Sequence, residues 1–230
     1  MLIPMSRKFS AVAFDLDGTL YPNYRLNLRL LPFLCKNWRL LAALARARNI
    51  IRREQEQSPA SVVPDFYDYQ ARITAKLLRA QPEQVKEKIN RLIYRGWEPH
   101  FSNITLFPHV RKILAELRAA GIKLGLLSDF PPQAKLQNLG IGDCWDTVLC
   151  SENIGALKPA VRPFIELANS LGFPPGQILY VGNSRLYDVG GAGQAGMKTA
   201  LLNRCPLSCT QPKADFIFHD YRQLRNFVLQ

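Results

Sequence analysis

Two carboxylates one residue apart, Asp15 and Asp17, are the residues in this sequence best suited to chemistry. They stand in the segment AVAFDLDGTL, directly after an apolar run of about the length of a buried strand. Gly18 allows a sharp turn after them, and Thr19 can stabilise it through a side-chain hydrogen bond. Neighbouring acids at the end of a buried strand repel each other and need a cation, a proton or a phosphate group nearby. The pattern is typical of a nucleophilic carboxylate with an acid/base partner beside a hard metal ion, although aspartates also favour turns for local hydrogen bonding alone.

Polar residues follow three later apolar segments, at positions where strands are expected to end. Ser128 follows KLGLL and can donate a hydroxyl hydrogen bond to an anion. Lys158, in the loop sequence GALKPA, brings a compact positive charge. Asn183 and Asp188 lie five residues apart in VGNSRLYD, across a turn into a glycine-rich helix. Each of these residues alone is explained as well by a turn, a solvated lysine or a helix cap, but their shared position at strand ends predicts one site.

The chain from Leu106 onward alternates between helical and strand patterns, and this alternation predicts the fold class. Strands separated by helices of about ten residues are typical of parallel βαβ units. Together with the strand before Asp15, they predict an α/β fold with a Rossmann-like parallel sheet. Expected strands cover 122–127, 147–150, 178–181, 199–202 and 215–218, and expected helices cover 108–120, 133–139, 163–171, 188–195 and 221–228.

Residues 22–104 contain no strand pattern and predict an all-helical domain inserted into the α/β fold. Helical patterns cover 26–53, with Pro32 near a helix start or at a kink, then 66–79 and 83–95, the last opening at Pro82. We therefore expect residues 1–21 and 105–230 to form the α/β core, and residues 22–104 to form a helical cap.

The four polar segments together resemble the haloacid dehalogenase superfamily, chiefly its magnesium-dependent phosphatase branch. FDLDGTL matches the first motif of that family, LLSD the second, the KP of GALKPA the third, and VGNSRLYDVGGAGQAGM the fourth. Residues 22–104 stand where that family inserts a mobile helical cap. The resemblance implies that Asp15 is the nucleophile and Asp17 the general acid/base. It also implies that Ser128 and Lys158 bind the phosphate group.

The same resemblance implies a Mg²⁺ cofactor, held by Asp15, the backbone carbonyl of Asp17, and the fourth-motif residues Asn183 and Asp188. That motif usually opens with GDS, and here it is GNS, with Asn183 in place of a carboxylate. An amide oxygen still coordinates Mg²⁺, but the site has one negative charge fewer. This weakens metal binding or passes the charged-ligand role to Asp188. Two outcomes stay open: an active phosphatase with altered metal dependence, and a protein with weak or lost turnover.

The implied reaction is hydrolysis of a small phosphate monoester through an aspartyl-phosphate. The dehalogenase branch of the family lacks the second acid of the first motif and needs no metal, so Asp17 favours phosphate chemistry. The cap selects the substrate in this family, but the sequence alone does not identify that substrate. Several aromatic residues could line the cap side of the site: Tyr24, Trp38, Tyr67, Tyr69, Tyr94 and Trp97.

The strongly basic composition suggests a second kind of function. The formal net charge is +12, and fifteen Lys or Arg stand against seven Asp or Glu between residues 22 and 104. The alternative is a weakly active or inactive relative that binds anions or nucleic acid through its basic cap, using Arg46, Arg48, Arg52 and Arg53 on two helical turns. No nucleic-acid motif is present, so no specific nucleic acid is expected. A third interpretation puts residues 26–51, with Trp38, at a membrane surface.

Cysteine use and hydropathy bear on the cellular setting. Five scattered cysteines, with no CxxC pair and no zinc spacing, predict reduced thiols in a cytoplasmic protein. The apolar run behind Arg7 and Lys8 is short and ends in an acid, which argues against a signal peptide. No uncharged segment is both long and apolar enough for a membrane span, so no membrane span is expected. We expect a monomer or homodimer that acts on a small phosphate ester.

Overall fold

A parallel β-sheet organises the computed structural model, which describes residues 8–58, 63, 65–102, 104–203 and 212–230. The strand order is β3-β2-β1-β4-β5-β6, and every neighbouring pair is parallel. The strands are β1 (Ala11–Phe14), β2 (Lys123–Ser128), β3 (Thr147–Cys150), β4 (Ile178–Gly182), β5 (Lys198–Leu202) and β6 (Phe216–Phe218). The predicted α/β fold with a Rossmann-like parallel sheet is confirmed.

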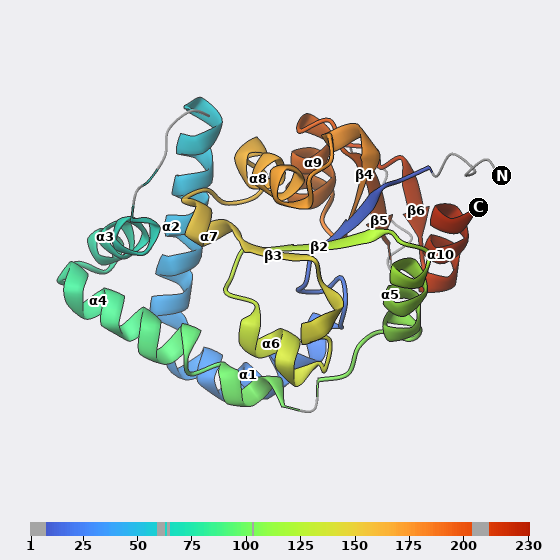
Figure 1. The fold of residues 1–230 in the computed structure, drawn as a ribbon. Coiled ribbons are helices and arrows are strands. Elements are labelled where there is room, and N and C mark those ends of the chain that lie inside the picture. Colours follow the sequence, from blue (N-terminus) through green and yellow to red (C-terminus); the bar gives the residue numbers. More distant parts are fainter. Residues whose placement is uncertain (1–7, 59–62, 64, 103, 204–211) are drawn as a thin grey trace, which may run out of the picture.

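Helices cover both faces of the sheet (Figure 1). Successive side chains of β1 point to opposite faces of the sheet. Val12 and Phe14 therefore belong to one hydrophobic cluster, and Ala11 and Ala13 belong to another. The first cluster includes side chains of α5 (Val110–Ala119), α6 (Gln133–Asn138) and α10 (Tyr221–Leu229), and the second includes side chains of α8 (Val161–Leu171) and α9 (Gly191–Gln194). Because both faces are covered, the two central strands β1 and β4 are buried along their whole length, as in other parallel sheets.

A helical insertion separates β1 from α5. Its helices are α1 (Asn23–Lys36), α2 (Trp38–Gln57), α3 (Phe66–Leu78) and α4 (Pro82–Ile89). Leu44, Ala75, Val85 and Ile89 form part of a separate hydrophobic cluster that joins α2, α3 and α4. Figure 1 shows these three helices on the opposite side of the molecule from α10 and the C-terminus. The insertion is therefore the helical cap expected from the sequence.

The first helix of the cap packs differently from the other three. Leu26 and Leu30 of α1 belong to the main hydrophobic cluster under the sheet, together with Phe101 from the other end of the insertion. The N–H of Phe107 donates to the carbonyl oxygen of Leu20 at 2.9 Å, so the two ends of the insertion are joined by a hydrogen bond. This arrangement fixes the start of α1 close to the turn that carries Asp17.

The break in the long helical region lies at Asn37, and Pro32 lies inside α1. The backbone N–H and the side-chain Nδ2 of Asn37 both donate to the carbonyl oxygen of Phe33, at 3.0 Å each. The side chain thus adds a second donor to the last helical hydrogen bond of α1, and α2 begins at Trp38. Asparagine at this position explains a break that the pattern over 26–53 did not predict.

Two further features of the described residues bear on the cellular setting. Within the described ranges, no helix combines the length and the apolar character needed to cross a membrane. Cys35, Cys144 and Cys150 are free thiols, while Cys205 and Cys209 lie outside the described residues.

Candidate active site

Asp15 lies in an enclosed position directly after β1. Its N–H donates to the carbonyl oxygen of Val181 at 2.9 Å, which continues the pairing of β1 with β4 by one residue. The Lys158 ammonium donates to its Oδ1 and the Thr19 hydroxyl donates to its Oδ2, both at 2.7 Å. Only 6% of the residue is exposed, and this burial raises the pKa of Asp15 to about 7 despite the opposing charge of Lys158.

Lys158 stands between two carboxylates. Its Nζ lies 2.7 Å from Oδ1 of Asp15 and 2.7 Å from Oδ1 of Asp188, and it also donates to the Tyr180 hydroxyl at 3.4 Å. Burial disfavours the ammonium form, but the charges of Asp15 and Asp188 hold the pKa of Lys158 well above its ordinary value. The side chain is therefore a permanent cation fixed beside Asp15.

The turn after β4 orients Asp188 toward Lys158. Oδ2 of Asp188 accepts the N–H groups of Asn183 at 3.1 Å and Ser184 at 2.9 Å. A π-helical turn over Arg185–Gly190 accommodates the five-residue spacing between Asn183 and Asp188. Gly182 is required here because a Cβ at this position would collide with the Asp188 side chain.

The turn after Asp15 is surrounded by amide side chains. Gly18 has φ +84°, in the left-handed region that favours glycine, and a Cβ there would collide with the Asn183 side chain. The same Cβ would lie 2.8 Å from Nδ2 of Asn23, at the start of α1. Among the described residues, Oδ1 of Asn23 is buried and has no hydrogen-bond partner. Asn183 therefore borders the turn that contains Asp17, as its place after β4 predicts.

Lys135 holds the carboxylate of Asp17. Its Nζ lies 2.7 Å from both oxygens of that carboxylate, and the Tyr21 hydroxyl donates to the same group. Lys135 extends from α6, and its Nζ lies 5.2 Å from the centre of the Phe101 ring and 5.8 Å from that of Phe130. Lys135 was not predicted as a site residue, because a single lysine in a helix after the second motif carries no distinguishing pattern.

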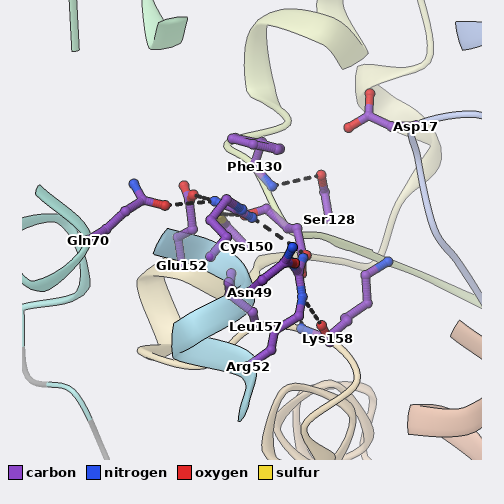
Figure 2. Close-up of polar contacts among 12 residues, drawn as sticks. Asp17, Asn49, Arg52, Gln70, Ser128, Phe130, Cys150, Glu152, Leu157 and Lys158 are labelled. Atoms are coloured by element: carbon purple, nitrogen blue, oxygen red, sulfur yellow. Dashed lines mark hydrogen bonds and ion pairs between the residues drawn. The ribbon is translucent and has the colours of Figure 1, made fainter. Parts of the chain in front are cut away.

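Ser128 and Asp129 lie at the end of β2. The Ser128 hydroxyl is fully buried and accepts the N–H of Phe130 at 3.3 Å (Figure 2). Oδ1 of Asp129 accepts the N–H of Lys158 at 3.1 Å, which ties this strand end to the Lys158 loop. Burial opposes the charged form of Asp129, but Lys158 and the two arginines Arg48 and Arg52 lower its pKa below the usual range.

The sequence pattern of the haloacid dehalogenase-like hydrolases matches residues 9–196. The chain belongs to this family. Its similarity to a glyceraldehyde 3-phosphate phosphatase of Methanopyrus kandleri is 30% identity over 214 residues, covering 89% of this chain and 88% of that protein. A phosphoglycolate phosphatase of Haemophilus influenzae is 28% identical over 235 residues, covering 96% and 98%.

Solved structures of the haloacid dehalogenase-like family share the fold. A phosphatase of this family from Thermococcus onnurineus has a TM-score of 0.64 and 26% identity, covering 95% of this chain and 97% of that one. An L-2-haloacid dehalogenase from Xanthobacter autotrophicus has a TM-score of 0.67 at 18% identity, covering 96% and 98%. The protein is therefore a hydrolase of this family, whose fold serves both phosphatases and dehalogenases.

The four arginines of α2 do not form one exposed surface, which removes the structural support for nucleic-acid binding by this group. Arg46 and Arg53 are exposed, whereas Arg48 is buried and Arg52 is half-buried. Arg48 forms an ion pair with Glu152 and donates to Oε1 of Gln70 at 3.0 Å. Two of the arginines considered for anion binding, Arg48 and Arg52, thus lie between the cap and the core instead of facing solvent.

The donors around the Asp15 turn suit a hard cation. Across the described residues, no three His, Cys, Asp or Glu side chains gather as a metal site. The groups near this turn are of mixed type: the carboxylate of Asp15, the main-chain carbonyl of Asp17 and the side-chain amide of Asn183, whose Nδ2 is the atom that a Cβ at Gly18 would meet. Oxygen donors of this kind fit Mg²⁺. The oxygens of Asp188 are already engaged by Lys158 and by two backbone N–H groups.

Proposed function

We propose that this protein is a magnesium-dependent phosphatase that hydrolyses small phosphate monoesters through an aspartyl-phosphate on Asp15. The observation that carries the proposal is the second carboxylate, Asp17, at the same turn as the buried Asp15. A halide leaves a carbon atom without a proton, whereas an alkoxide leaving group needs one. Asp17 can supply that proton, and the phosphatase names of the two relatives agree with this choice.

Each side chain of the site has a part in this reaction. Lys158 reduces the repulsion between the Asp15 carboxylate and the phosphoryl group, and the Ser128 hydroxyl donates to a phosphate oxygen. An Asp15 oxygen forms a bond to phosphorus while the bond from phosphorus to the leaving alkoxide breaks, and protonated Asp17 gives its proton to that alkoxide. Asp17 then accepts a proton from the water that attacks phosphorus, so Asp15 is restored and inorganic phosphate is released.

The proposed Mg²⁺ is held by the carboxylate of Asp15, the carbonyl of Asp17 and the side chain of Asn183. When bound, the ion neutralises phosphoryl charge and orients the group for in-line attack. We assign Asp188 to the support of Lys158 rather than to direct ligation, because its oxygens already accept from the ammonium and the backbone. The replacement of a carboxylate by Asn183 then leaves Asp15 as the one charged side-chain ligand.

A cavity between the cap and the core is the proposed site for the organic part of the substrate. Its volume is about 270 Å³, and its walls include Tyr94, Trp97 and Phe101 of the insertion with Phe130 and Lys135 of the core. A cavity of this size fits a small organic group. Lys135 joins this space to Asp17, so the leaving group would lie next to the proposed proton donor. We expect the substrate to be a small cytoplasmic phosphate ester, bound by a monomer or homodimer.

The test is a screen of about a hundred phosphate monoesters with and without Mg²⁺, together with 2-chloropropionate. We expect Mg²⁺-dependent phosphate release, inhibition by beryllium fluoride, and loss of nearly all turnover in Asp15→Asn, since an amide is not a nucleophile of this kind. The matched control is Asp143→Asn, an exposed aspartate far along the chain from the site. Full activity of Asp15→Asn, or chloride release without phosphate release, would contradict the proposal.

A further inference from the structure

One guanidinium of the cap touches three loops of the α/β core. Nε of Arg52 donates to the carbonyl oxygen of Lys158 at 2.8 Å, and Nη2 donates to Oδ2 of Asp129 at 2.8 Å. The guanidinium carbon also lies 4.5 Å from the centre of the Tyr187 ring. Asp129 follows β2, Lys158 precedes α8, and Tyr187 belongs to the turn that carries Asp188. Arg52 therefore links the three segments that surround Asp15.

The backbone of Lys158 is held on both sides through this contact. Its carbonyl oxygen accepts from Arg52, and its N–H donates to Oδ1 of Asp129, whose other oxygen is bound by the same arginine. Figure 2 shows Arg52 beside Leu157 and Lys158, with the Lys158 side chain directed away from Glu152. Arg52 from the cap and Asp129 from the core thus together hold the backbone of Lys158 in place.

Gln55, about one helical turn after Arg52 on α2, binds the same loop. Nε2 of Gln55 donates to the carbonyl oxygen of Gly155 at 3.3 Å, and Oε1 of Gln55 accepts the N–H of Leu157 at 3.1 Å. Leu157 also packs in a small hydrophobic cluster with Ile51 of α2. The loop that ends in Lys158 therefore takes its conformation largely from contacts with α2 rather than from a neighbouring strand.

We propose that Arg52 is a positioning residue for Lys158, so that the seating of α2 on the core completes the site. This inference rests on the proposed function, in which the Lys158 ammonium must stay 2.7 Å from Asp15 while also meeting a phosphoryl group. Arg52 does not line the substrate cavity and does not contact Asp15, and it acts through the main chain of Lys158, through Asp129 and through the Tyr187 ring. A misplacement of about 1 Å in a charged catalytic group costs on the order of a hundredfold in rate.

The experiment measures kcat and KM for an activated aryl phosphate with saturating Mg²⁺ in wild type, Arg52→Ala and Arg52→Lys. We expect Arg52→Ala to lower kcat by about 10- to 100-fold, while KM changes less than about threefold. A lysine can bind Asp129 or the Lys158 carbonyl but not both, so Arg52→Lys should recover only part of the loss. Added methylguanidinium should restore turnover in Arg52→Ala and leave wild type unchanged.

Arg53→Ala is the matched control, because Arg53 is the next residue of the same helix and is exposed. It should keep wild-type kcat and KM. Arg52→Lys keeps the inference testable if Arg52→Ala does not fold. If the wild type is active and both Arg52 variants keep a kcat within twofold of the wild-type kcat, the inference is overturned while the proposed function stands. A rise in KM at constant kcat would have the same consequence. A wild type without any turnover would overturn the proposed function and the inference with it.

Discussion

Removal of the Lys158 charge should destabilise the folded protein far more than removal of an equally short ion pair at the surface. At 2.7 Å, each of its two carboxylate contacts is worth about 6 kcal/mol at an effective dielectric constant of about 20, before desolvation is subtracted. Deleting one member of a buried ion pair costs about 3–5 kcal/mol in practice, because the remaining charge is left unpaired. Lys158→Met keeps the length of the side chain, and we expect it to lose stability in that range.

The control is Lys123→Met, which removes a pair with Asp146 of the same length, 2.7 Å, at a site where the lysine side chain is 54% exposed. An exposed pair contributes about 0–1 kcal/mol. Both variants are unfolded with urea at pH 8 in the presence of EDTA, so that no divalent cation replaces the missing ammonium. Adding Asp188→Asn to Lys158→Met should recover about 1–2 kcal/mol, since it removes one of the two unpaired carboxylates.

The cost of Lys158→Met should also depend on pH. Burial already raises the pKa of Asp15 to about 7, and loss of Lys158 raises it further, so the folded variant takes up a proton as the pH falls. The loss of stability should therefore be smaller at pH 6 than at pH 8. Equal, small losses in Lys158→Met and Lys123→Met at pH 8 would refute the assignment of Lys158 as the cation that neutralises Asp15 and Asp188.

Three further perturbations test other parts of the site. Asn183→Asp should tighten Mg²⁺ binding about tenfold by calorimetry, because it adds a charge beside the ion; unchanged affinity would remove Asn183 from the ligand set. Gly18→Ala should cost about 1–3 kcal/mol in urea unfolding and lower turnover, because φ is +84° and the new Cβ meets Asn183; wild-type stability would contradict the strain. Burial raises the pKa of Glu152 to about 7, above the value of this group in the unfolded chain. The folded state therefore binds one proton more than the unfolded state between pH 4.5 and 7, and the free energy of unfolding should fall by up to about 3 kcal/mol as the pH rises through this window. Glu152→Gln should show a smaller fall over that window, and an identical pH profile would be the contrary result.

The parts of the fold that follow from local pattern were predictable. Each strand is a short apolar run between helical segments, and parallel strands bring their carboxyl ends to one edge of the sheet. That geometry explains why Asp15 and the turn that carries Asp188 lie near each other, and the Lys158 ammonium lies 2.7 Å from a carboxylate oxygen of each. Lys158 itself follows α7 (Ser151–Ile154) rather than a strand, so its expected place at a strand end is wrong. The π-helical turn over Arg185–Gly190, which carries Asp188, was not predictable in this way, because the pattern indicated only a helix over 188–195.

The contacts between the cap and the core were not predictable in the same way. Arg52 and Arg53 are adjacent basic residues of one helix, yet one binds Asp129 and Lys158 while the other is exposed. Lys135 binds Asp17, whereas Lys123 forms a surface pair. These differences depend on how the helices of the insertion pack against loops that are distant in the sequence. Hydrophobic periodicity reports local structure only, so a single sequence does not reveal this packing.

The hydrogen bond between Phe107 and Leu20 makes the helical insertion a closed loop with its two ends in contact. The entropy of closing a loop grows only with the logarithm of its length, by about 0.6 kcal/mol for each doubling. The entropic cost of closing the insertion therefore depends little on how many residues lie between Leu20 and Phe107. For protein engineering, this junction is a graft point at which a cap of another length could be exchanged, provided that Leu26, Leu30 and Phe101 still fill the main core and that the new cap supplies its own arginine and glutamine for the Lys158 loop.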